Sequence, residues 1–307
     1  MEIPGGLKVI SVVNNKGGVG KTTVTKALAE YTAQIEGYRT LLLDMDAQCS
    51  LSNRYLAMEQ ARDAAGSFAP PIHPEFRSDD PDMDGWSGRS STSDLYYDMK
   101  YGIYPYPTGY ERLEILPAHG STLRAVDLQR REDIEALIVS RLRQFLWTEE
   151  VAEQYDVVII DTAPAKSPVT QSTFRAGTHI VIPTMLDSLG MEGIYGMLRY
   201  YQDERMRRGA SDTPLELVGI LPNQVRPRTR QAKEVLRDLR NPELGLSKYL
   251  LNSQLGLRTA LTVVNAREEE PESVFQLPPS DPAHQEAYAA CEEIWDRILG
   301  REGSKHA

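Results

Sequence analysis

The most constraining feature of this 307-residue chain is a glycine- and lysine-rich loop at residues 14–23, with the sequence NNKGGVGKTT. It follows an apolar run at residues 9–13 and precedes a segment whose apolar residues have helical spacing. Glycines let the backbone curl with its N–H groups pointing inward, and the N-terminus of the next helix adds positive potential at the same place. The loop therefore predicts a polyphosphate site between a strand and a helix.

Two side chains of this loop have specific expected roles. Lys21 is predicted to reach the β- and γ-phosphates, and the Thr22 hydroxyl to bind a magnesium ion. The usual motif has a glycine at the position of Asn15, whereas here a second lysine, Lys16, precedes the glycines, which is the deviant Walker A form. The other residues expected to contact the nucleotide are Gly17, Gly18, Val19, Gly20 and Thr23.

Three aspartates follow apolar runs that read as buried strands. Residues 38–43 run into Asp44 and Asp46, and residues 157–160 run into Asp161. Because the carboxyl ends of parallel strands face one crevice, these carboxylates are expected beside the phosphate loop. Alternation places Asp44 and Asp46 on one face, so that one supports the metal while the other orients a water; Asp161 is the expected outer-shell carboxylate.

Strands and helices alternate along the rest of the chain. Further strands are expected at residues 113–117, 179–183, 217–223 and 249–251, and helices at about 125–153, 191–208 and 283–299. Helical spacing puts Leu137 on the core face of the first of these helices. This pattern predicts an α/β fold, a mostly parallel twisted sheet flanked by helices on both faces, as one domain over residues 1–307. A stretch at about 62–93, rich in Pro, Gly, Ser and Asp, has no apolar face and is predicted to be a mobile insertion.

Composition excludes several classes of protein. The net charge of −10 argues against a chain that coats nucleic acid over its whole surface. The two cysteines, Cys49 and Cys291, have no metal-binding or disulfide-scaffold spacing. With no basic leader and no apolar run long enough to span a bilayer, the protein is expected to be soluble and intracellular.

A local basic stripe stands out against this acidic background. At helical spacing, the stripe lies opposite Ala232, Val235 and Leu239. It is either an ordinary solvated face or a surface for nucleic-acid phosphates, and the lack of interleaved aromatic residues argues against single-strand stacking. The stripe comprises Arg230, Lys233, Arg237 and Arg240, extended by Arg226 and Arg228.

Several motifs together resemble the ParA family of DNA-partition ATPases, within the deviant-Walker group that also includes MinD. They are KGGVGKTT at 16–23, DMDAQCSLS at 44–52, VVIIDTAP at 157–164, IVIPTMLDSLGMEGI from 180, RPRT at 226–229 and AYAACEE at 287–293. The resemblance covers nearly the whole chain except residues 62–93. ParA members usually have Asp-Pro-Gln-Gly after the second strand, whereas this chain has Asp-Ala-Gln-Cys at 46–49.

The resemblance implies ATP and Mg²⁺ as cofactors and assigns roles to single residues. Lys16 would reach the nucleotide across a dimer interface, and Lys21 would hold the β- and γ-phosphates. Asp46 would position the hydrolytic water, while Thr22, Asp44 and Asp161 would serve the metal. Asn223 would lie against the adenine.

In the cycle that the resemblance implies, the protein forms a homodimer in the ATP state, and this dimer binds double-stranded DNA without sequence preference. A ParB-type centromere-binding protein would stimulate a slow ATPase and so drive plasmid or chromosome segregation in the cytoplasm, on the nucleoid. The basic stripe, with Arg258, would be the DNA surface.

Other classes of P-loop protein fit these residues less well. A MinD-like membrane ATPase needs a basic C-terminal amphipathic helix, but residues 283–299 are acidic there, so no membrane partner is expected. A nitrogenase-reductase type needs paired cluster cysteines, and a GTPase an Asn-Lys-x-Asp motif; both are lacking. The remaining alternatives are a relative that positions a protein cargo or the division machinery, and a P-loop metabolic enzyme.

Overall fold

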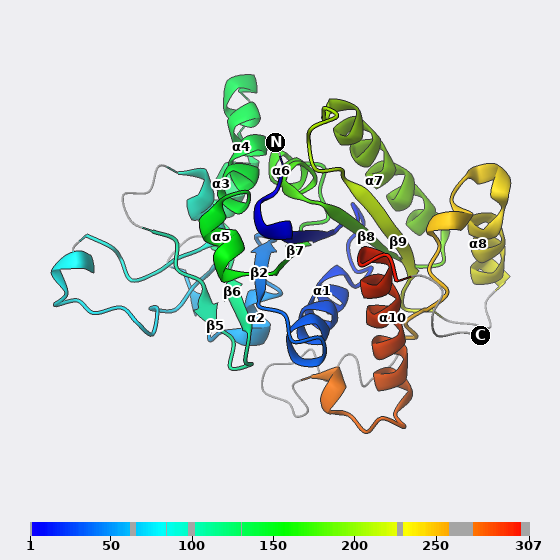
Figure 1. Cartoon of the computed structure of the whole chain (residues 1–307), viewed down its shortest axis with the longest axis horizontal. Coiled ribbons are helices and arrows are strands. Elements are labelled where there is room, and N and C mark those ends of the chain that lie inside the picture. Colours follow the sequence, from blue (N-terminus) through cyan, green and yellow to red (C-terminus); the bar gives the residue numbers. More distant parts are fainter. Residues whose placement is uncertain are drawn as a thin grey trace.

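A central sheet with helices on both faces organises the chain in the computed structural model (Figure 1). The structure describes residues 2–61, 66–83, 85–97, 102–129, 131–225, 230–257 and 273–301. Arg226, Arg228 and Arg258 of the predicted DNA surface lie outside these residues.

The sheet has seven strands in the order β5-β6-β2-β7-β1-β8-β9. Every pairing is parallel except the one between β5 and β6, as the predicted fold class requires. A separate two-stranded ribbon joins β3 and β4. The strands are β1 (Lys8–Val12), β2 (Thr40–Met45), β3 (Glu59–Gln60), β4 (Phe68–Ala69), β5 (Tyr106–Pro107), β6 (Leu113–Leu116), β7 (Val157–Thr162), β8 (His179–Thr184) and β9 (Glu216–Pro222).

Helices form a layer on each side of the sheet (Figure 1). One layer consists of α1 (Lys21–Glu30), the short α2 (Ser52–Tyr55) and α10 (Pro282–Ile298). The other consists of α3 (Gly120–Asp127), α4 (Glu132–Leu146), α5 (Glu149–Gln154), α6 (Pro168–Ala176) and α7 (Ser188–Arg207). Single 3₁₀ or π turns occupy Pro4–Gly6, Tyr31–Ile35, Pro81–Met83, Thr92–Tyr96, Pro242–Leu244, Ser247–Tyr249 and Val274–Gln276.

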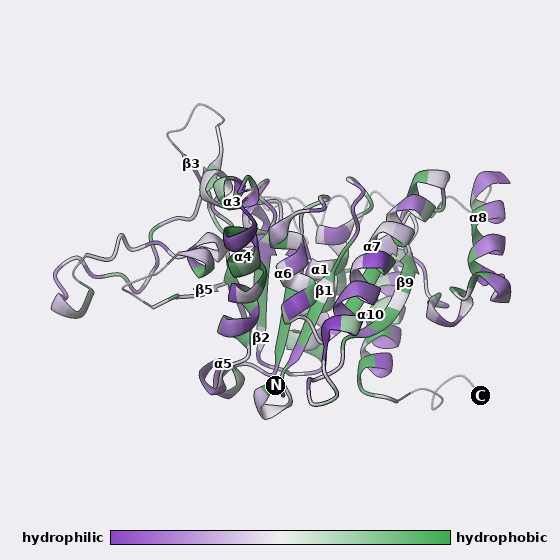
Figure 2. Ribbon diagram, turned by 90° about the horizontal axis from the view of Figure 1, so that it is seen from above, coloured by the Kyte–Doolittle hydropathy of each residue, from purple (hydrophilic) through white to green (hydrophobic). Residues whose placement is uncertain are grey.

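Covering both faces buries the middle of the sheet completely. All residues of β2, β7 and β8 are buried, which explains why these strands read as continuous apolar runs (Figure 2). Two segments lie outside the layers, at opposite edges of the sheet. Helix α8 (Arg230–Arg240) lies beyond β9, and the segment around residues 66–97 extends beyond β5 (Figures 1 and 2).

Three sequence expectations need correction. The helix predicted at 125–153 is three helices, because the chain leaves the helical conformation at Trp147 and the Thr148 hydroxyl caps a new helix by accepting from the N–H of Val151. Leu137, expected on the core face, is 43% exposed. The strand expected at 249–251 is a 3₁₀ turn followed by a single bridge between Leu250 and Ile220.

The segment predicted to be a mobile insertion has an aromatic cluster of its own. The ring of His73 lies 5.9 Å from that of Trp86 and 4.6 Å from that of Tyr106, and Trp86 lies 4.6 Å from Tyr104. These contacts tie the described part of the segment to β5. Its mobility stays a prediction.

No helix in the described ranges combines the length and apolar character needed to cross a bilayer.

Arg208 joins α6 to the end of α7. Its side chain is only 4% exposed; Nε donates to Glu204 at 3.1 Å, and Nη2 donates to the carbonyls of Phe174 at 2.9 Å and Gly177 at 2.8 Å. The carbonyls at the C-terminus of α6 have no partners within that helix, so the guanidinium satisfies them.

Replacing Arg208 by lysine is expected to lower the free energy of unfolding by about 2–3 kcal/mol, because one ammonium group cannot reproduce the fork of donors. Urea unfolding monitored by circular dichroism measures this. The matched change at the exposed neighbour, Arg207→Lys, is expected to stay within about 0.5 kcal/mol. Equal losses in the two variants would contradict the capping role.

Candidate functional site

The phosphate loop lies between β1 and α1, at the carboxyl ends of the parallel strands. Gly18 and Gly20 have φ values of 75° and 84°, the left-handed region that favours glycine. A Cβ at Gly20 would also lie 2.1 Å from Nδ2 of Asn223. Both the backbone angle and the lack of space therefore require glycine at position 20.

The loop presents free backbone donors at the start of α1. In the described part of the chain, the N–H groups of Gly17 and Gly18 have no protein acceptor, and both residues are exposed. They lie just before the N-terminus of a ten-residue helix, where anions are favoured. This backbone fits a bound phosphate group.

The two lysines of the loop occupy different places. Lys21 is buried, and its Nζ donates to the carbonyl of Lys16 at 3.2 Å. Burial lowers the pKa of Lys21, while Asp161 and Asp46 oppose that shift. Lys16 points to the surface instead, where its Nζ forms an ion pair with Glu192 of α7 at 3.2 Å.

Asp161, near the end of β7, contacts Thr22, and both residues were predicted to serve the metal. Its Oδ2 accepts a hydrogen bond from the Thr22 hydroxyl at 2.6 Å, and its Oδ1 accepts from the N–H of Thr162 at 3.1 Å. Burial, and then the charge of Asp44, raise the pKa of Asp161 to about 8. A desolvated carboxylate beside a hydroxyl is a hard oxygen donor set that fits Mg²⁺. Thr22 and Asp161 are the residues that would hold the ion.

Asp44 has a different set of partners. Its Oδ2 accepts from the N–H and hydroxyl of Ser52 at 2.8 and 2.7 Å. Burial raises its pKa to about 6. Asp46 is partly exposed, and its Oδ1 accepts from the N–H of Gln48 at 2.9 Å. In the described ranges, no three acidic, histidine or cysteine side chains form a metal-binding group, so the metal role of Asp44 stays a prediction.

The end of β9 holds the phosphate loop from the other side. Nδ2 of Asn223 donates to the carbonyl of Val19 at 2.7 Å, and Nε2 of Gln224 donates to that of Gly18 at 2.5 Å. The sequence analysis did not identify Gln224, or Ser52 beside Asp44, as residues of the site. The only signal in the sequence for Gln224 is that it follows Asn223, a predicted site residue. The predicted contact of Asn223 with adenine stays a prediction.

Helix α8 has the two faces that its spacing predicts. Ala232, Val235 and Leu239 are buried. The opposite face is exposed: the Arg230 side chain is 93% exposed and pairs with Glu234 at 2.9 Å. Such an exposed pair contributes little stability, so it does not prevent Arg230 from binding another anion. The exposed basic residues of α8 are Arg230, Lys233, Arg237 and Arg240.

A family model described as an AAA domain matches residues 7–208, which include the loop, Asp44, Asp46 and Asp161. The chain belongs to this AAA domain family. Within the family it is distantly homologous to Soj and ParA, so the predicted relation to ParA-type partition ATPases is confirmed at that level.

The individual matches differ in coverage. The chain is 32% identical over 194 residues to the putative replication protein A of Rhizobium rhizogenes, covering 62% of this chain and 44% of that protein. It therefore spans less than half the length of that relative. It is 29% identical over 239 residues to the chromosome-partitioning ATPase Soj of Thermus thermophilus, covering 75% of each.

Among solved structures, a complex of a McdA variant with ATP from Cyanothece superposes with a TM-score of 0.70, covering 98% of this chain and 99% of that one. Because the sequence identity is only 15%, this likeness confirms the predicted α/β fold of the chain and is not evidence for its function.

The buried carboxylate of Asp161 predicts a pH dependence of stability. Its folded pKa of about 8 exceeds its ordinary value of 3.8, so its contribution is fully present below pH 3.8 and is lost as the pH rises through 8. His179, whose pKa burial lowers from 6.5 to about 4, contributes above pH 6.5. Without metal or nucleotide, the unfolding free energy is expected to fall as the pH rises from 6.5 to about 8.

The test is urea unfolding across that range in the presence of a chelator. Asp161→Asn is expected to flatten most of the slope, whereas the exposed control Glu149→Gln leaves it unchanged. A slope that persists in Asp161→Asn would contradict the assignment.

Proposed function

We propose that the protein is an ATPase that forms an ATP-dependent dimer, binds DNA without sequence preference and takes part in DNA partition. The observation that carries the proposal is the loop with two lysines in different places. Lys21 lies inside the loop, where a polyphosphate binds, and Lys16 lies outside it.

The outward direction of Lys16 supports a dimer. In this chain Lys16 pairs with Glu192, whose side chain is 69% exposed, and exposed pairs are weak. In a dimer, Lys16 could leave Glu192 and bind the phosphates of the nucleotide held by the second copy, which carry several negative charges. Two polyphosphates that face each other need positive charge from both chains, which gives the second lysine a physical reason.

Hydrolysis is assigned to the acidic ends of β2 and β7. Thr22 and Asp161 would hold Mg²⁺, which neutralises charge on the phosphates. Asp46, partly exposed and close enough to influence the charge of Lys21, would position the attacking water. A weak basal rate, stimulated by a partner protein, is what the relation to ParA-type partition ATPases implies.

DNA binding is assigned to the exposed face of α8. Dimerisation doubles this basic surface, so a chain with a net charge of −10 remains compatible with phosphate binding. The partner in partition would be a ParB-type centromere-binding protein, and the site of action the nucleoid in the cytoplasm. The alternative function is the positioning of a protein cargo. It would use the same ATP-dependent dimerisation and DNA binding, with a different partner protein.

The deciding experiment is binding to an arbitrary duplex with ATP, with ADP and without nucleotide. ATP-dependent binding that ignores sequence supports the proposal. If ATP drives dimerisation but no DNA binds, the basic face of α8 is only solvated and the DNA role is wrong.

Substitutions in the loop and at Asp46 are expected to separate binding from turnover. Lys21→Ala should abolish ATP binding in equilibrium dialysis, because it removes the buried cation of the loop. Asp46→Ala should keep ATP binding and dimerisation but lower turnover at least about a hundredfold. An Asp46→Ala variant with normal phosphate release would rule out the assigned role.

Neutralising the basic face of α8 is expected to weaken DNA binding without changing basal ATPase. Replacing Arg230, Lys233 and Arg237 by glutamine should reduce the slope of log affinity against log salt by about two to three. The matched control replaces the exposed residues Arg199, Arg205 and Arg207 of α7, for the same loss of charge. Equal losses in both triple variants would mean that DNA senses only net charge.

A further inference from the structure

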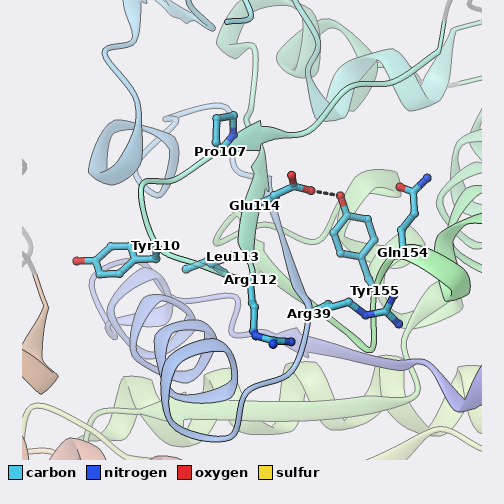
Figure 3. Close-up of a pocket in the computed structure, with 8 residues that line it drawn as sticks. All are labelled: Arg39, Pro107, Tyr110, Arg112, Leu113, Glu114, Gln154 and Tyr155. Atoms are coloured by element: carbon cyan, nitrogen blue, oxygen red, sulfur yellow. Dashed lines mark hydrogen bonds between the residues drawn. The ribbon is translucent and has the colours of Figure 1, made fainter. Parts of the chain in front are cut away.

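A groove lies beside the sheet edge at β5 and β6, away from the phosphate loop. It has a volume of about 770 Å³ and runs between residues 73–75, 94–97 and 102–107 on one side and the helices α4 and α5 on the other. Leu41 and Glu114, from the amino-terminal halves of β2 and β6, line its floor. An adjoining cavity of about 300 Å³ shares Glu114, Gln154 and Tyr155 with it (Figure 3).

The groove is not part of the nucleotide site. The phosphate loop lies at the carboxyl ends of the strands, whereas Leu41 and Glu114 are each the second residue of their strand. None of the predicted site residues lines the groove. An occupant would therefore leave the phosphate loop open.

The lining of the groove carries an excess of negative charge. Four carboxylates, Glu75, Asp94, Glu114 and Glu150, line it together with one basic side chain of permanent charge, Arg141. Asp94 and Glu114 already have partners, since Asp94 accepts from the N–H of Ser91 and Glu114 from the Tyr155 hydroxyl (Figure 3). Glu75 and Glu150 are exposed. This charge disfavours nucleic acid and favours a cationic ligand.

Two exposed tyrosines and two glutamines in the lining indicate which kind of cationic ligand the groove would bind. Tyr97 is 46% exposed and Tyr104 is 38% exposed, and Tyr104 is held by the ring of Trp86. Tyrosine faces attract guanidinium and ammonium groups. Gln144 and Gln154, exposed on α4 and α5, offer donors and acceptors that match a peptide backbone.

We propose that this acidic tyrosine groove binds an extended segment of a partner protein that is rich in arginine or lysine. The carboxylates of the groove favour basic side chains in the bound segment. The amides of Gln144 and Gln154 can donate to peptide carbonyls, which a simple polyamine lacks, so they favour a peptide. The groove gives the inserted segment a role that does not depend on the proposed ATPase cycle.

The test uses the full chain and a fluorescent alternating arginine–alanine peptide, with fluorescence anisotropy at about 150 mM salt. The double variant Glu75→Lys/Glu150→Lys is expected to weaken binding at least about tenfold. The control double variant Asp79→Lys/Glu149→Lys makes the same charge change at exposed neighbours outside the groove and is expected to change affinity less than about twofold. Equal weakening in both would mean general attraction to an acidic protein and would overturn the proposal.

Two further measurements address the chemistry of the site. Tyr97→Ala is expected to weaken binding about threefold, whereas Tyr97→Phe keeps the ring and the affinity. If both variants bind the peptide as tightly as the unchanged protein, Tyr97 does not contact the peptide. Spermidine is expected to compete far less well than unlabelled peptide; equal competition would mean a polyamine site and overturn the peptide assignment.

Discussion

The structure depends on how a glycine-rich backbone is held in a conformation that leaves its N–H groups free. Amide side chains do this from two directions. Asn14 donates to the carbonyl of Pro183 at 2.9 Å and accepts from the N–H of Lys16 at 3.0 Å, while Asn223 and Gln224 hold the carbonyls of Val19 and Gly18. These amides occupy the carbonyls of Val19 and Gly18, while the N–H groups of Gly17 and Gly18 have no protein acceptor in the described part of the chain and stay open to an anion.

The same arrangement brings two buried carboxyl groups close to the loop. Asp161 and Asp44 end adjacent strands in register, and burial raises the pKa of both. Such a pair is costly in a buried place and would become favourable beside a cation, which is the physical basis for the magnesium role proposed for this end of the sheet. Helix α1 begins at Lys21 and places Thr22 against Asp161, so one helix carries both the buried lysine of the loop and the hydroxyl beside this carboxyl group.

Charge is separated between the two edges of the molecule. Helix α8, beyond β9, presents arginine and lysine, whereas the groove beside β5 presents carboxylates and tyrosines (Figure 1). A chain with this distribution offers one edge to a polyanion and the other to a polycation, with the nucleotide loop between them. Two partners of opposite charge can then bind without competing for one surface.

Patterns within the sequence predicted the loop, the positions of the buried strands β2, β7 and β8 along the chain and the two faces of α8. These are local features: glycine spacing, continuous apolar runs and helical periodicity each act within one element. Only the tertiary structure decided which partners those elements meet. The contact of Asp44 with Ser52 joins a strand to the helix that follows it, eight residues away. The ion pair of Lys16 with Glu192, 176 residues away, and the hydrogen bond from Gln224 to Gly18, 206 residues away, join distant segments. The acidic groove belongs to the same group, because its lining comes from β2, β6, α4, α5 and the inserted segment, and no periodicity within one of them signals the others.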